Sequence, residues 1–296
     1  MIKVENLCKK FDSFQILDNI NIQVKKGSIY ALVGTNGAGK TTLIKHLTGV
    51  LKPDSGIITI DGVSVFEEEE IKAKIGYIAD NLYFFNTYNL KEMARFLKGV
   101  YLNWNQDRYD KMANMFKLDS SKKLSRFSRG MQKQAAFVLT MSTMPEYLIL
   151  DEPIDGLDPI VRRQIWKYIV DDVSQRQMTV LISSHNLREI ENLCDCVGII
   201  SNGKTVIEQN LDDLKSNVHK VQVAYANEPT DPFAGLNVLH ADKQGSVHLL
   251  ILKDKREVVE EVLNKGNPAI LDILPLSLEE IFIYELGGSE NEEVLF

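Results

Sequence analysis

The chain has 296 residues, of which 44% are hydrophobic and 25% charged, a globular composition long enough for one large domain and a small one. Its 34 basic and 41 acidic residues give a formal net charge of −7, so the overall charge does not favour wrapping DNA or RNA, although a local basic patch is not excluded. The three cysteines have no companions at zinc spacing, and the N-terminal region lacks an apolar stretch long enough for a signal peptide or membrane span. We therefore expect a cytoplasmic protein with reduced thiols, held at a membrane only through a partner.

Most of the chain predicts an α/β fold with two kinds of sheet. Short strand-like runs separated by Gly, Asp and Pro come first and predict an antiparallel layer; they are residues 2–7, 20–24 and 56–65. Unbroken apolar runs, each followed by a polar turn and a helical pattern, predict the strands of a buried parallel sheet. These runs are residues 29–34, 147–153 and 179–185. Between the first two of them, a mostly helical pattern predicts a helical subdomain over about 81–145.

From about residue 217 the pattern changes to β-β-α-β-α, and we place a domain boundary near residue 214. Residues 214–288 show the apolar faces of a small α+β domain without a phosphate loop, metal cluster or acid pair, which favours an accessory domain over a second enzyme. On its last helix, Ile281, Phe282 and Tyr284 either contact another molecule and support dimerisation, our hypothesis, or complete the small core. The acidic tail 289–296 resembles part of an engineered protease site, so an added origin is one interpretation.

The segment "GTNGAGKT", residues 34–41, fits the pattern G-x-x-x-x-G-K-[ST] between a predicted strand and a predicted helix. Its glycines allow successive backbone N–H groups to converge on phosphate oxygens, and the helix N-terminus adds partial positive charge. Lys40 supplies a cation for the β- and γ-phosphates, and the Thr41 hydroxyl can ligate Mg²⁺. The alternative, a glycine-rich turn, is disfavoured by this context. We expect nucleotide contacts from Gly34, Thr35, Asn36, Gly37, Ala38, Gly39, Lys40, Thr41 and Thr42.

Two acids follow the predicted strand in "YLILDEP", residues 147–153. Hydrolysis of a bound nucleotide needs a metal ligand and a group that orients the attacking water. Asp151 is placed to hold Mg²⁺ and Glu152 to accept a proton from water. Alone, such a pair is more often a helix cap or a solvated turn; beside a phosphate loop, it favours catalysis.

The chain resembles the ABC ATPase family once further motifs are included. "FSRGM", residues 127–131, resembles the family's signature motif, "IDGLDP", residues 154–159, resembles its D-loop, and "SSHNLREIENLCD", residues 183–195, resembles the segment of the switch histidine. With the phosphate loop, the acid pair and an aromatic near the start, six motifs lie in family order over residues 1 to about 213. The resemblance implies nucleotide contacts from Phe11, Ser128, Gly130 and Asp158, a catalytic role for His185 beside Glu152, and a metal site formed by Thr41, Asp80 and Asp151.

Two segments depart from the family pattern, at three positions. The signature segment carries Arg129 in place of its first glycine and Met131 in place of its final glutamine. Asp80 stands where the family usually has Gln, and in many exporter subunits Glu. Because an aspartate is one methylene shorter than a glutamate, the reach of Asp80 toward the metal, and with it the turnover, is in question.

The resemblance implies a P-loop NTPase fold for residues 1–213 and a function. The resemblance is greatest to exporter ATPases of the bacterial bacitracin, lantibiotic and Ytr type, which hydrolyse ATP with Mg²⁺ and work with separate transmembrane permease subunits at the inner face of the membrane. Because such subunits close one signature on the other's phosphate loop, a second ATPase subunit is implied, in a homodimer or a heterodimer. The aromatics Tyr83, Phe84, Phe85 and Tyr88 lie where the membrane subunit would dock, or form helical core. A non-transport ATPase of translation or DNA maintenance and a slow regulatory nucleotide switch are the alternatives, and no nucleic acid is expected.

Overall fold

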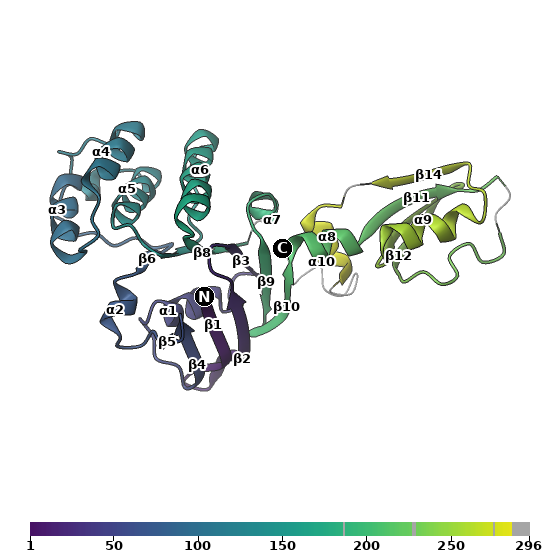
Figure 1. The fold of residues 1–296 in the computed structure, drawn as a ribbon, viewed down its shortest axis with the longest axis horizontal. Helices are drawn as coiled ribbons and strands as arrows, with labels where there is room; N and C mark the ends of the chain where they lie inside the picture. Colours follow the sequence, from purple (N-terminus) through teal and green to yellow (C-terminus); the bar gives the residue numbers. More distant parts are fainter. Residues whose placement is uncertain (186, 227–228, 275, 286–296) are drawn as a thin grey trace. The chain divides into compact units, whose positions relative to one another are not determined.

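The structure is a computed structural model that describes residues 1–185, 187–226, 229–274 and 276–285. It divides into two compact units (Figure 1). The first comprises Met1–His185 and Gly198–Glu208, and the second comprises the described residues of Asn186–Val197 and Gln209–Phe296. The boundary near residue 214 that the sequence predicts stays a prediction. None of the helices within the described ranges is long and apolar enough to cross a membrane.

The first unit begins with the antiparallel layer that the sequence predicts. Its strand order is β2-β1-β4-β5, with bounds β1 (Ile2–Phe11), β2 (Phe14–Val24), β4 (Ser55–Ile60) and β5 (Val63–Ser64). Ile2 pairs with Val24 on one side and with Ile60 on the other, and all three side chains are fully buried. Alternate residues of these strands therefore form one apolar face.

The second sheet of this unit has the order β10-β9-β3-β8-β7-β6. Its strands are β3 (Ile29–Val33), β6 (Ile75–Ile78), β7 (Tyr147–Asp151), β8 (Thr179–Ser184), β9 (Cys196–Ser201) and β10 (Lys204–Asn210). The pairs β3–β8, β8–β7 and β7–β6 are parallel, and every residue of β3, β7 and β8 is buried. The predicted parallel sheet is thus confirmed, and burial on both faces explains why its strands have no alternation.

Helix α1 (Lys40–Leu47) packs against β2 of the antiparallel sheet and against β7 of the parallel sheet. Its Leu43, Ile44 and Leu47 are fully buried, so this helix joins the cores of both sheets. The short α2 (Glu69–Lys72) follows the antiparallel strands, and α6 (Pro159–Arg176) follows β7. The first residue of α1 is therefore fixed between two packed layers.

The helical part of the first unit contains α3 (Leu90–Val100), α4 (Gln106–Met115), the short helix η1 (Leu124–Arg126) and α5 (Arg129–Ser142). Helix α5 packs against α3, α4 and β6, and so connects this group to the parallel sheet (Figure 1). Asp172 of α6, only 5% exposed, accepts hydrogen bonds from Arg108 of α4, at 2.9 Å from Nη1 to Oδ1, and from Arg176, at 2.7 Å. An ion-pair cluster thus ties α4 to α6.

The second unit contains a four-stranded antiparallel sheet of order β12-β13-β11-β14. Its elements are α7 (Leu187–Ile190), α8 (Leu211–Asn217), β11 (His219–Ala224), β12 (Val238–Gln244), β13 (Val247–Leu252), α9 (Arg256–Asn264), β14 (Ile270–Leu274) and α10 (Leu278–Glu285). Val259 and Leu263 of α9 pack with Val221, Val223 and Leu250 in one buried cluster. The small α+β fold matches the prediction except for β12, which the sequence analysis missed.

Helix α10 packs against α7 and β12 within the second unit. Ile281 is fully buried, and the Tyr284 ring lies 5.1 Å from the imidazole of His240, centroid to centroid. The hypothesis that Ile281 contacts another molecule is therefore wrong, because this side chain is buried within its own unit, on the helix that packs against α7 and β12. The side chain of Phe282 and the tail 289–296 lie outside the part of the chain that is described.

Candidate active site

The loop from Gly34 to Gly39 leaves β3 and enters α1 at Lys40. Gly39 has φ 109°, and a Cβ there would lie 2.7 Å from Leu17 Cδ2, so both the backbone conformation and the space require glycine. A Cβ on Gly34 would lie 2.3 Å from the carbonyl oxygen of Ile200. The chain can therefore make this tight turn between a buried strand and a helix only with glycines at these two positions.

Lys40 is 6% exposed, and its ammonium lies inside the loop. Nζ donates to the carbonyl oxygens of Gly34, at 2.6 Å, and Thr35, at 3.2 Å, and lies 3.7 Å from Oε1 of Glu152. Burial lowers the pKa of Lys40, and the carboxylates of Glu152 and Asp151 oppose this shift. A buried cation beneath a loop that leads into a helix N-terminus without acidic residues is suited to bind an anion.

A hollow of about 360 Å³ lies at this loop. It brings together most of the predicted phosphate contacts, and its lining residues are Ile16, Thr35, Asn36, Gly37, Gly39, Lys40, Thr41, Thr42, Asp80 and Glu152. Gly34 and Ala38 belong to the loop backbone instead: the Ala38 N–H donates to the carbonyl of Thr35, at 3.2 Å. The hollow thus contains a loop, a cation and two carboxylates.

Asp151 ends β7 and is 1% exposed. Its Oδ1 accepts a hydrogen bond from the Ser183 hydroxyl at 2.6 Å, which fixes the carboxylate. With the Thr41 hydroxyl at the hollow, it supplies the oxygen donors that Mg²⁺ prefers. Asp151 is not among the residues that line the hollow, although its charge acts on the pKa of Lys40. By the chemistry of their oxygen atoms, Thr41 and Asp151 are the groups that would hold a magnesium ion accompanying a nucleotide.

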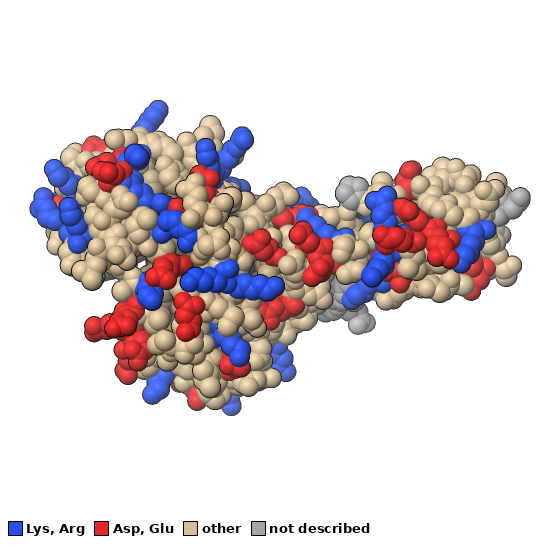
Figure 2. All heavy atoms as spheres, in the orientation of Figure 1, with Lys and Arg blue, Asp and Glu red and all other residues tan. Residues whose placement is uncertain are grey.

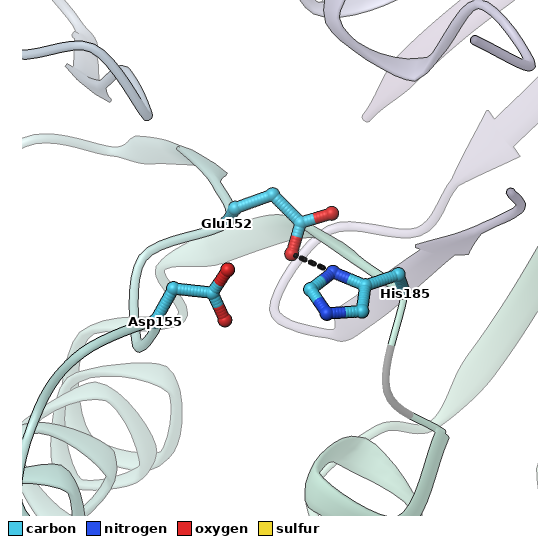
Figure 3. A group of neighbouring side chains, drawn as sticks. All are labelled: Glu152, Asp155 and His185. Carbon is cyan, nitrogen blue, oxygen red and sulfur yellow. Dashed lines mark hydrogen bonds and ion pairs between the residues drawn. The ribbon is translucent and has the colours of Figure 1, made fainter. Parts of the chain in front are cut away.

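Glu152 follows β7 with a φ of 47°, a left-handed conformation that is uncommon for a residue with a Cβ. Its backbone N–H donates to Ser183 Oγ at 3.1 Å. Its Oε2 lies 3.0 Å from His185 Nδ1, and the imidazole must be the donor because a carboxylate only accepts (Figure 3). Burial raises the pKa of Glu152, whereas His185 and Lys40 lower it. A carboxylate with a raised pKa is a better proton acceptor.

Asp155 is a site residue that the sequence analysis missed. Its carboxylate and that of Glu152 both point toward the imidazole of His185, and ligand atoms of the three lie within 4.8 Å of one another (Figure 3). Two carboxylates and an imidazole can hold a divalent cation of the transition series more readily than Mg²⁺, which prefers oxygen donors. In the sequence, Asp155 lies within the segment 154–159 that resembles the D-loop, three residues after Glu152, but it was not assigned a role there.

Asp80 follows β6 and lines the hollow, but its carboxylate is engaged by two cations of α5. Oδ1 accepts a hydrogen bond from Arg129 Nη2 at 3.1 Å, and Lys133 Nζ lies 3.7 Å from the same oxygen. Two of the three residues that depart from the family pattern, Asp80 and Arg129, therefore contact each other. Lys133 is a second residue that the sequence analysis missed.

Besides Gly34 and Ala38, four predicted nucleotide contacts outside the loop do not line the hollow. Ser128 caps α5 by accepting the Met131 N–H at 3.3 Å, and Asp158 caps α6 by accepting the N–H groups of Ile160 and Val161 at 3.0 Å each. Gly130 lies in the first turn of α5. Phe11 ends β1, and its ring is 44% exposed. Ser128, Gly130 and Asp158 are thus not among the residues that line the hollow of their own chain.

A phosphate loop between a buried parallel strand and a helix, beside a strand that ends in acids, defines a P-loop nucleoside triphosphatase. The sequence pattern of the family described as ABC transporter matches residues 17–155. The chain is 30% identical over 291 residues to the ABC transporter ATP-binding protein YtrB of Bacillus subtilis (strain 168), covering 98% of this chain and 100% of that protein. It is 37% identical over 223 residues to the bacitracin transport ATP-binding protein BcrA of Bacillus licheniformis, covering 74% of this chain and 73% of that protein.

A solved structure described as the ATP-binding subunit of an ABC transporter superposes with a TM-score of 0.67 at 27% identity, covering 73% of this chain and 92% of that one. The chain therefore belongs to the ABC transporter family of ATP-binding proteins and is an ABC ATPase. The match to YtrB extends over both compact units, so the second unit is shared with that relative.

Proposed function

We propose that this ATPase powers export of a peptide, antibiotic or other small amphipathic molecule through separate transmembrane subunits. One observation supports ATP hydrolysis at this site: Lys40 and Glu152 line the same hollow, and the Lys40 ammonium lies 3.7 Å from the Glu152 carboxylate. The name of the relative BcrA, a bacitracin transport ATP-binding protein, supports a role in transport. The direction of transport rests on the resemblance to exporter ATPases.

The roles of the residues follow from their positions. The loop N–H groups and Lys40 bind the β- and γ-phosphates, and Glu152 accepts a proton from the attacking water. His185, hydrogen-bonded to Glu152 at 3.0 Å, orients that carboxylate and contacts the γ-phosphate. Thr41 and Asp151 hold the Mg²⁺ that, when bound, neutralises phosphate charge. Asp80 contributes to metal binding only if its carboxylate leaves Arg129.

A groove supports docking of a transmembrane subunit. It measures about 460 Å³ and lies between β6 and the helical part, lined by Tyr77, Leu82, Tyr83, Phe84, Met93, Leu97 and Tyr101 among others. Tyr83 is 83% exposed there. Phe85 packs on Tyr88 with ring centroids 5.0 Å apart but is still 41% exposed, so the alternative that these aromatics form buried helical core is not favoured. We propose that an apolar helix of the permease occupies this groove at the inner face of the membrane.

Dimerisation is the second assembly that we propose. Because Ser128, Gly130 and Asp158 do not line the hollow of their own chain, a second ATPase subunit would have to bring them to the bound nucleotide. A homodimer and a heterodimer both satisfy this requirement. On the face shown in Figure 2, acidic and basic side chains of the described residues are mixed over the first unit. The absence of a nucleic-acid partner stays a prediction.

A slow regulatory nucleotide switch is the second candidate function. The observation that favours it is the hydrogen bond from Arg129 to the Asp80 carboxylate, which competes with any contact that Asp80 makes to a ligand in the hollow. Single-turnover hydrolysis of ATP separates the two candidates. The exporter ATPase requires hydrolysis that Glu152→Gln reduces by at least about 100-fold, as expected for a lost general base, with ATP binding retained. Sedimentation should then show an ATP-dependent dimer of this variant. Wild-type turnover by Glu152→Gln would refute the assignment of the base.

A further inference from the structure

The backbone of Glu152 is held on both sides in its left-handed conformation. Its N–H donates to Ser183 Oγ at 3.1 Å, and its carbonyl oxygen accepts a hydrogen bond from Lys133 Nζ at 2.7 Å. A residue with a Cβ keeps a φ of 47° only when its surroundings enforce it. The direction of the Glu152 side chain therefore depends on these two contacts.

Lys133 lies in the second turn of α5 and is 2% exposed. Burial lowers its pKa, and the carboxylates of Asp80 and Asp155 oppose this effect. A buried ammonium is costly unless it is paired and hydrogen-bonded, and a methionine would fill the same space without that cost. Packing alone therefore does not explain a lysine at this position, whereas the hydrogen bond to Glu152 does.

The same ammonium also reaches the loop after β6. Its Nζ lies 3.7 Å from Asp80 Oδ1, the oxygen that accepts from Arg129 at 3.1 Å. Arg129 and Lys133 are four residues apart on α5 and so lie on one side of the helix. Helix α5 thus places two cations, Arg129 and Lys133, beside Asp80. Lys133 also contacts the backbone of Glu152.

We propose that Lys133 is a positioning residue for ATP hydrolysis, which holds the Glu152 carbonyl and thereby directs the Glu152 carboxylate into the phosphate-loop hollow. The inference rests on the proposed role of Glu152 as the base. Lys133 itself touches neither the nucleotide nor the water. Its loss affects the hydrolytic step through Glu152 and leaves the loop that binds ATP unchanged.

The test is single-turnover hydrolysis together with ATP affinity in the full chain. Lys133→Met keeps most of the length and removes the charge and the donor; we expect a rate constant at least about 10-fold lower, with ATP affinity within about twofold of wild type. Lys133→Arg keeps a donor and should restore the rate to within about threefold. Lys167→Met, on the exposed side of α6, is the matched control and should change neither quantity.

A double-mutant cycle distinguishes positioning from a general structural role. In a Glu152→Gln background, Lys133→Met should lower the residual rate by less than about twofold, because both changes act through one group. If the two losses multiply, or if Lys133→Met weakens ATP binding as much as it slows hydrolysis, the proposal is wrong. Should Lys133→Met fail to fold, Lys133→Leu, which also lacks a donor, replaces it, and wild-type hydrolysis by that variant overturns the inference.

The outcomes also separate this inference from the proposed function. If Glu152→Gln hydrolyses ATP at the wild-type rate, the assignment of the base fails and the role of Lys133 fails with it. If Glu152→Gln is inactive while Lys133→Met hydrolyses normally, only the positioning role is lost. These two results require no transmembrane partner.

Discussion

Replacing Lys40 with methionine should separate nucleotide affinity from stability. The ammonium lies in a site where it is 6% exposed, so water cannot substitute for it. A hydrogen bond to a charged group contributes about 1.5 to 3 kcal/mol, which corresponds to about 10- to 150-fold in affinity. In the wild-type chain, Lys40 Nζ lies 3.7 Å from the Glu152 carboxylate. Without this cation, the negative charge of Glu152 repels an anionic ligand more strongly. We therefore expect the affinity for ATP to fall by about 100-fold, near the upper end of this range.

The stability of the folded chain without nucleotide, unlike its affinity for ATP, should not fall when Lys40 is replaced. Because burial lowers the pKa of Lys40, the unfolded chain binds this proton more tightly than the folded chain, and the charge disfavours folding at pH values below the folded pKa. Lys40→Met should therefore leave the midpoint of thermal unfolding unchanged or raise it. Competition with a fluorescent nucleotide and thermal unfolding measure the two quantities, with exposed Lys45→Met of the same helix as control. Wild-type affinity for ATP, or a clear fall in the unfolding midpoint, would refute the reasoning.

Three further predictions concern other parts of the first unit. Because burial raises the pKa of Glu152, single-turnover hydrolysis should fall on acidification at a pH above the ordinary glutamate value of about 4.3; an acid limb at or below that value would contradict it. Asp172→Asn should lower the free energy of unfolding by about 2 to 3 kcal/mol because two arginines lose their partner, whereas exposed Asp171→Asn should not, as denaturant unfolding can show. Tyr83→Ser should keep basal hydrolysis and weaken association with a transmembrane subunit in pull-down assays; equal binding by it and by Val170→Ser, an exposed control, would count against the groove.

The sequence predicts best where the signal is contiguous. The strands β3, β7 and β8 are unbroken apolar runs because both faces of the sheet are covered, and the phosphate loop is one uninterrupted motif. Strand β12 has no such signal: six of its seven residues are exposed, so neither an apolar run nor an alternation marks it. Strand β6 is four residues long, too short for its period to be recognised.

The parts of the site that the sequence analysis missed depend on distant contacts. Lys133 meets the Glu152 carbonyl from 19 residues earlier in the chain, and in a helix pattern it is indistinguishable from a solvated lysine. Asp155 can be assigned to the site only from the structure, which places it near His185. Arg129 and Asp80 each look like an unfavourable departure when considered alone, whereas the structure shows that they pair. Charge compensation of this kind is a property of the folded chain, and no short motif contains it.

The two helix caps that we expect to face a partner subunit offer it opposite chemistry. The Ser128 hydroxyl accepts the Met131 N–H and still has a hydrogen to donate, so it can cap its helix and bind an anionic oxygen at once. The Asp158 carboxylate accepts two N–H groups and can only accept again, so it is suited to N–H or O–H groups of the neighbour. Aspartate would serve as well as serine for helix α5 alone, yet it would repel a phosphate. Fewer residues at position 128 are therefore compatible with ATP binding by a partner subunit than with a stable helix α5. A variant at this position that folds normally can still fail to assemble around ATP.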